Sequence, residues 1–307
     1  MGSPVTSADF RRLVEGHVRN VSVQALDFLP SRKTDLFNVM DSDRPYEDFY
    51  DITGVPDIPD FGGKVSYLSI SPGWYTKIEP RVFAGGIQFE RTLLDDEQYG
   101  VLAKRAQSLA EAANRTMVKH EVRPFAYAFS SAFEFHTSEE GVALCSNSHT
   151  NKSGASTSTG FDNLGTSALS KTSVAAARLA LRQFRSDIGE RYYVGDDLCL
   201  IVPDALEEEA WEITNTKIGK DTAEGNMNFH AGRYEIITLP LLDDFDSNNW
   251  FLAGKSRMKE DLIWIDRVKP DPSQEWDLDS FILKLVIYFR IAYGWRGWRW
   301  VFGNQVS

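Results

Sequence analysis

The chain has 307 residues and a formal net charge of −11, from 33 Lys and Arg against 44 Asp and Glu. Its 42% hydrophobic and 25% charged residues are typical of a globular protein, and its acidic balance argues against a free-standing protein that binds DNA by neutralising phosphates. Cys145 and Cys199 are too few for a disulfide scaffold, so we expect a reduced compartment. Lys284 and Arg290 interrupt the most apolar stretch, residues 281–295, so we expect no membrane partner.

Residues 1–60 combine charged residues with scattered apolar ones and are followed by a predicted hairpin. The first segment cannot build its own core, so we expect either a flexible leader or an arm that lies on another surface. Alternating apolar and polar residues predict strands over 64–70 and 87–91. Three aromatic residues lie between these strands, where exposure would be wasteful in a monomer, so we expect the hairpin tip to contact a neighbouring subunit. The expected contact residues are Trp74, Tyr75, Lys77, Arg81 and Phe83.

A long helix is predicted next, over residues 92–119. Thr92 is a candidate N-cap, Asp95 stands three residues later as in a capping box, and apolar residues recur at helical spacing as far as Met117. The apolar face is narrow and rich in alanine, which suits packing against a sheet.

The middle of the chain is predicted to mix strands and helices. Alternating aromatic residues indicate a strand over 125–135, and Ser, Thr, Asn and Gly indicate a loop over 147–165. A helix is expected over 173–187, and a continuous apolar run indicates a buried strand over 198–202. A second helix is expected to open at residues 203–204.

The C-terminal part is predicted to be rich in strands. Short strands are expected at 235–239, 250–253 and 262–265. Every odd position from 281 to 295 is apolar, a period of two that predicts one long strand. Beyond it the apolar residues move to even positions, which indicates a turn or bulge.

The motifs for common chemistry are missing or incomplete. Cys145 and His149, with His136 nearby, are too few for a zinc site. Residues 244–255 begin like a calcium loop but carry Asn249 and Lys255 where Gly and Glu are required. Sequences for a nucleophile elbow, a phosphate-binding loop, a dinucleotide site or an HExxH zinc site are also missing. We therefore assign no catalytic residue, no cofactor and no metal.

The order of these elements resembles the major capsid proteins of tailed bacteriophages, which have the Hong Kong 97 fold. Several stretches are similar to that family, and they are residues 90–96, 141–149, 200–207, 226–241 and 293–303. The first two of these are especially similar to Mu-like head subunits. The resemblance extends from about residue 36 to the end. It implies an α+β Hong Kong 97-type capsid fold with an N-arm, an extended E-loop hairpin, a P-domain with a long spine helix and long β-strands, and a central α/β A-domain.

The resemblance also implies a division of the chain into segments. These are an N-terminal arm at 1–60, the E-loop at 61–91, the P-domain at 92–165, the A-domain at 166–275 and C-terminal P-domain strands at 276–307.

The implied function is that of a structural protein, not an enzyme. Copies would form hexamers and pentamers of an icosahedral head that encloses double-stranded DNA, contacted without sequence specificity. A portal protein and separate scaffolding and decoration proteins are the further expected partners. The expected location is the virion capsid, assembled in the host cytoplasm. The alternatives are an encapsulin-like shell and, in a different class, a soluble α+β hydrolase.

Overall fold

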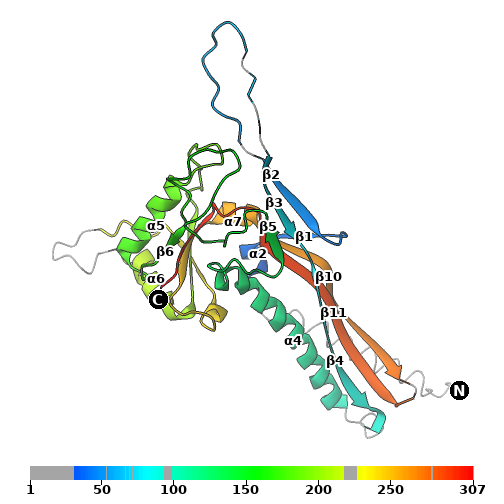
Figure 1. Cartoon of the computed structure of the whole chain (residues 1–307). Coiled ribbons are helices and arrows are strands. Elements are labelled where there is room, and N and C mark those ends of the chain that lie inside the picture. The colour runs from blue at the N-terminus through cyan, green and yellow to red at the C-terminus, as the bar shows by residue number, and fades with distance from the viewer. Residues whose placement is uncertain are drawn as a thin grey trace, which may run out of the picture.

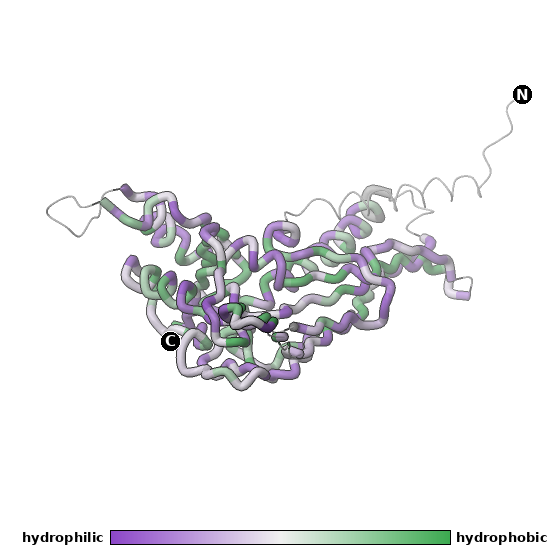
Figure 2. Tube along the Cα trace, turned by 90° about the horizontal axis from the view of Figure 1, so that it is seen from above, coloured by the Kyte–Doolittle hydropathy of each residue, from purple (hydrophilic) through white to green (hydrophobic). Residues whose placement is uncertain are grey.

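The computed structural model describes residues 31–306 except 53, 66, 69, 71, 93–98, 218–226 and 278. The first half of the predicted arm therefore lies outside the described residues. Figure 1 shows a long sheet with a helix beside it, a second body built on another sheet, and a loop that projects away from both. Hydrophobic residues run through the middle of the elongated molecule, and hydrophilic ones are frequent along its outline (Figure 2).

The long sheet has four strands, in the order β1 (Asn38–Asp41), β10 (Leu262–Asp277), β11 (Ile282–Trp295) and β4 (Arg81–Glu90). Strand β1 is parallel to β10, and the other pairings are antiparallel. The long strand predicted over 281–295 is confirmed as β11. Its odd-numbered side chains from 283 onward are buried, and the even-numbered ones up to Arg290 are partly or fully exposed, whereas residues 291–295 are all buried. The strand predicted at 262–265 is the beginning of the much longer β10.

The outer part of β10 has one strand neighbour among the described residues. Strand β1 pairs only with residues 263–266, and β11 pairs along the whole length of β10. Pro270 and Pro272 lie in the part beyond β1. Proline has no backbone N–H, so it is tolerated where a strand forms the edge of a sheet.

The long helix α4 (Tyr99–Ala126) packs against β4 and β11. It confirms the predicted helix but continues past residue 119, and Asp95 of the predicted capping box lies outside the described residues. The strand predicted over 125–135 is wrong, because Phe125 belongs to the helix and residues 127–135 form turns and irregular backbone. Phe125 is buried with its ring edge-on to Phe251 and Trp300, a contact that its helical position provides.

The second body is built on a five-stranded sheet. Its strands, in spatial order, are β6 (Leu164–Gly165), β12 (Val301–Asn304), β9 (Trp250–Gly254), β7 (Leu198–Val202) and β8 (Glu235–Thr238). Strands β7 and β9 are buried along their whole length, which confirms the predicted buried strand over 198–202. The chain passes from this sheet to the long sheet between β9 and β10, and it returns between β11 and β12.

Two helices and several short turns complete this body. Helix α5 (Lys171–Gln183) confirms the helix expected at 173–187 and begins with a capping box between Ser170 and Ser173. A 3-10 turn, η1 (Asp204–Leu206), leads into α6 (Glu207–Asn215), the helix expected after Pro203. The remaining short elements are α2 (Lys33–Leu36), η2 (Pro240–Leu242) and α7 (Lys255–Asp261).

A third sheet carries the projecting loop. Its order is β2 (Glu47–Ile52), β3 (Pro72–Ile78) and β5 (His136–Ser138). The predicted hairpin of strands 64–70 and 87–91 is wrong. The described residues of 64–70 are irregular, and residues 87–90 belong to β4, which pairs with β11 and not with β3. The chain instead leaves the body between β2 and β3 and returns, as Figure 1 shows.

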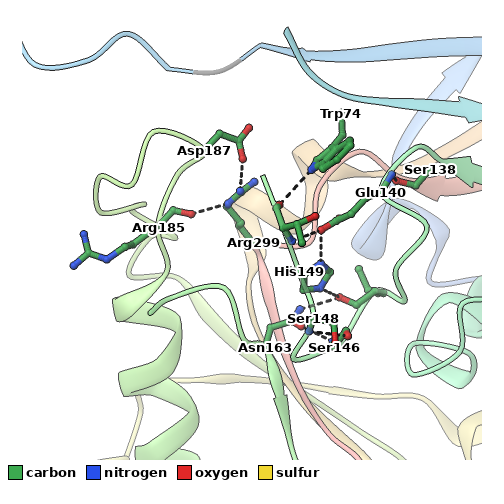
Figure 3. Close-up of polar contacts among 12 residues, drawn as sticks. Trp74, Ser138, Glu140, Ser146, Ser148, His149, Asn163, Arg185, Asp187 and Arg299 are labelled. Atoms are coloured by element: carbon green, nitrogen blue, oxygen red, sulfur yellow. Dashed lines mark hydrogen bonds and ion pairs between the residues drawn. The ribbon is translucent and has the colours of Figure 1, made fainter. Parts of the chain in front are cut away.

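A buried polar network fixes the loops below the third sheet (Figure 3). The Arg299 guanidinium pairs with Asp187 and donates from Nε to the carbonyl of Arg185 at 2.7 Å. The His149 ring stacks on Trp298 with centroids 4.1 Å apart, and its Nδ1 lies 3.2 Å from Glu140 Oε1. These contacts join segments that are far apart in the sequence.

We expect Asp187→Asn to lower the free energy of unfolding by about 3 kcal/mol, because it leaves the buried Arg299 cation without its counter-charge. Urea unfolding of the unassembled subunit measures the change. Asp35→Asn is the matched control, because the Arg32–Asp35 pair is half exposed and is expected to contribute at most about 1 kcal/mol. Equal losses for the two variants would contradict this role for the buried pair.

Candidate inter-subunit surfaces

The projecting loop, residues 54–70, exposes apolar side chains that have no cover in the isolated chain. Six of its described large apolar residues are more than half exposed, and they are Val55, Ile58, Phe61, Val65, Tyr67 and Ile70. Ile58 is 89% exposed and Tyr67 is 94% exposed. Soluble monomers rarely expose apolar residues so densely, so a partner surface is expected to cover them.

The foot of this loop is held firmly by β2 and β3. The rings of Tyr50 and Tyr75 lie 5.1 Å apart, and the Tyr75 hydroxyl donates to Asp48 at 2.5 Å. Trp74 Nε1 donates to the carbonyl of Thr150 at 3.2 Å, a contact visible in Figure 3. A Cβ at Gly73 would come within 2.9 Å of Asp51, so the two strands approach too closely for a larger residue there. The loop therefore leaves the body from a rigid base.

Three of the predicted contact residues lie at this foot and not at a tip. Trp74 and Tyr75 are half-buried in β3, and Lys77 of the same strand pairs with Glu79 at 3.2 Å and lies over the Tyr46 ring. The expectation that these aromatics project from the body is wrong, because β3 is packed between β2 and β5.

The other two predicted residues lie in β4. Arg81 pairs with Glu134 at 3.1 Å, and Phe83 stacks on Phe289 with centroids 5.2 Å apart. The structure thus separates Arg81 and Phe83 from the loop. Whether any of the five residues contacts another subunit stays a prediction.

The sequence did contain a signal for the loop that was missed. Phe61 follows two prolines and precedes Gly62 and Gly63, a composition typical of a turn and not of a strand. The alternation over 64–70 resembles a half-buried strand, but its apolar members Val65, Tyr67 and Ile70 are all exposed.

A second exposed apolar surface lies on the long sheet. Val82, Val286 and Tyr288 are at least 38% exposed and occupy neighbouring positions of β4 and β11. Their side chains alternate with the buried ones that face α4, so they lie on the opposite face of the sheet.

A cavity of about 250 Å³ separates the foot of the loop from the second body. Tyr50, Asp51 and Trp74 line it on one side, and Arg257, Asp261 and Arg296 line it on the other. Burial, with smaller contributions from Asp51 and Glu260, raises the pKa of Asp261 to about 6, while Arg296 and Arg257 oppose the shift. Asp261 also ends helix α7, where the helix dipole disfavours a negative charge.

The side chains first considered for chemistry are buried and structural. Burial raises the pKa of the Cys199 thiol to about 12 and also raises that of Cys145, which makes both thiols poor nucleophiles. Burial lowers the pKa of His136 to about 4. Within the described residues, no three His, Cys, Asp or Glu side chains are grouped so as to hold a metal ion.

None of the described helices combines the length and the apolar character that a bilayer span requires.

Comparisons with known proteins agree with this geometry. A family model described as "Phage capsid protein" matches residues 74–303. The procapsid of bacteriophage JBD30 is similar in structure, with 13% identity, a TM-score of 0.52, and coverage of 98% of this chain and 76% of that chain. No curated protein matches the chain.

Two further solved structures show the same fold. The Mycobacterium phage Patience structure has 11% identity and a TM-score of 0.55, covering 99% of this chain and 91% of that chain. The cyanophage Pam1 capsid has 8% identity and a TM-score of 0.56, covering 88% of this chain and 87% of that chain. The Mu-like subgroup stays a prediction. The predicted Hong Kong 97-type fold is confirmed, and the chain belongs to the phage capsid protein family, with the structural, shell-forming role of a major capsid protein.

Proposed function

We propose that this protein forms the hexamers and pentamers of an icosahedral phage head around double-stranded DNA. The observation that carries the proposal is the exposed apolar projecting loop, which would be covered if another copy lay beneath it. A head subunit meets several neighbours, and a projecting loop reaches them without a larger globular core. The head would be assembled in the host cytoplasm, and the protein would act there as a structural component and not as an enzyme.

The topology supports a revised division of the chain. We assign the E-loop to β2, the projecting loop and β3, which places it earlier than residues 61–91. The P-domain would contain α4 and the long sheet, including β10, and the A-domain would contain the five-stranded sheet, including β12. The N-terminal arm would end before β2.

The other partners follow from the same proposal. A closed head needs an opening for DNA, which a portal protein would occupy. Scaffolding and decoration proteins would act on the assembled surfaces, and the DNA would be contacted without sequence specificity. The chain's net charge of −11 suits a container from which DNA must be released.

We expect the double variant Phe61→Ser, Tyr67→Ser to fold normally but not to assemble. Both side chains are at least 75% exposed, so the free energy of unfolding should change by no more than about 0.5 kcal/mol. Size-exclusion chromatography and negative-stain microscopy would report loss of particles. Tyr193→Ser is the control, because Tyr193 is also an exposed aromatic residue, at 59%, but is not part of the loop. Normal shells from the double variant would contradict the role of the loop.

We expect Asp261 to make the subunit more stable as the pH falls from 7 towards 4.5. The pKa of Asp261 is about 6 in the folded chain against 3.8 for an ordinary Asp, so the folded state takes up the proton first. The free energy of unfolding rises over this range by an amount on the order of 2 kcal/mol. This stabilisation is complete below 3.8, the pKa of Asp261 in the unfolded chain, and it is lost as the pH rises through 6.

Urea unfolding at a series of pH values tests this expectation. Asp261→Asn should remove that part of the pH dependence, whereas Asp57→Asn on the exposed loop should keep it. Identical pH profiles for wild type and Asp261→Asn would show that Asp261 ionises in the folded chain as it does in water.

A further inference from the structure

A small basic surface lies on the second body, around a half-exposed aromatic ring. The Phe229 side chain is 50% exposed, and the guanidinium groups of Arg233 and Arg178 lie 4.0 and 4.9 Å from its centroid. Lys171 adds a third positive charge at the beginning of α5, and all three cations together with burial lower the pKa of His230 beside Phe229. Within the described part of the chain, no carboxylate is within ion-pair distance of these three cations. In a protein of net charge −11, a basic surface that has no counter-charge among the described residues indicates an anionic partner.

An acidic surface lies on the same body. The first turn of α6 contains Glu207, Glu208 and Glu209, all exposed, and Trp211 in the next turn is 57% exposed. The helix dipole stabilises the three carboxylates at this end, but it does not account for an exposed tryptophan beside them. Among the described residues, none of the three glutamates has a cation within ion-pair distance.

The two surfaces lie at opposite ends of α6. Asn228, next to Phe229, donates from Nδ2 to the carbonyls of Ile213 at 2.7 Å and Thr216 at 2.9 Å. The basic surface is therefore fixed at the C-terminal end of the helix, and the glutamates lie at its N-terminal end, about 10 Å away along the axis. Figure 1 shows α5 and α6 together at the end of the molecule that lies away from the long sheet.

We propose that the basic surface around Phe229 docks onto the glutamates and Trp211 of α6 in a second copy of this chain, head to tail around each capsomer. The surfaces have opposite charge, each includes an exposed aromatic ring, and they occupy different positions on one body. Such a contact is heterologous, and repeated contacts of this kind form a ring when the rotation closes. This proposal rests on the proposed function, since it specifies how neighbouring subunits meet.

Charge reversal tests the contact. Variant A carries Glu207→Lys and Glu208→Lys, and variant B carries Lys171→Glu and Arg233→Glu. Each variant alone brings like charges together, so the concentration needed for assembly should rise at least about tenfold. Combining all four substitutions in one chain should restore assembly, because the two surfaces are again complementary.

Mixing variants A and B gives a sharper outcome. The two chains attract only each other, so they must alternate around a ring, and only even-numbered rings can close. The mixture should therefore form hexamers but no pentamers, and negative-stain microscopy should show open sheets or tubes in place of closed heads. Closed heads from the mixture, or from either variant alone at wild-type concentration, would overturn the proposal.

The controls separate this proposal from the proposed function. Lys104→Glu with Arg105→Glu gives the same charge change as variant B on an exposed part of α4 and should leave assembly unaffected. If the wild-type chain forms no rings or shells, the proposed function fails and this contact fails with it. If wild type assembles and the reversals have no effect beyond this control, only the contact fails.

Two further outcomes are decisive. Normal assembly of variant B with loss of packaged DNA would assign the basic surface to nucleic acid and overturn the contact.

If the reversed chains do not fold, as judged by circular dichroism, the milder pair Arg233→Gln and Glu208→Gln replaces them. Each of these two substitutions alone should raise the concentration needed for assembly. The effect of the double variant should be smaller than the sum of the two separate effects, and additive effects would overturn the contact.

Discussion

The antiparallel pairing of β10 with β11 is the interaction on which the rest of the structure depends. Both strands have one end inside the second body, where Leu262 pairs with Trp295, and both extend outward to the pairing of Asp277 with Ile282. Strand β4 and helix α4 pack on this ribbon, and the crossings to β9 and β12 anchor it in the five-stranded sheet. The inner ends of both strands, residues 262–266 and 291–295, are buried, so the ribbon is rigid where the two bodies meet.

This arrangement concentrates burial along the ribbon and leaves the periphery poorly covered. Near the centre, the buried rings of Trp264 and Tyr293 stack on each other, and Phe37 lies edge-on to Trp264. The projecting loop and the outer face of the long sheet lie farther from this centre, and they carry many of the exposed large apolar residues. This apolar surface is therefore available for contacts between copies.

Sequence patterns predicted the elements that face the core along their whole length, because their apolar residues recur at a regular period. The odd-numbered apolar residues of β11 and the continuous apolar run of β7 both face a core along their length, so their patterns were reliable. The alternation at Phe125 was misleading, because the same residue also fits the helical face that packs on Phe251 and Trp300. The placement of Trp74 and Tyr75 depended on β2 and β5, strands whose pairing with β3 no local pattern specifies.

The prolines of β10 restrict how copies of the chain can join. Beyond residue 266, the side of β10 that lies away from β11 would otherwise be a template on which a foreign strand could form backbone hydrogen bonds. Pro270 and Pro272 remove two donors from this part of the strand. Continuous cross-β stacking through this edge, the route by which sheet proteins become fibrils, is therefore disfavoured even at the very high local concentration inside a growing shell.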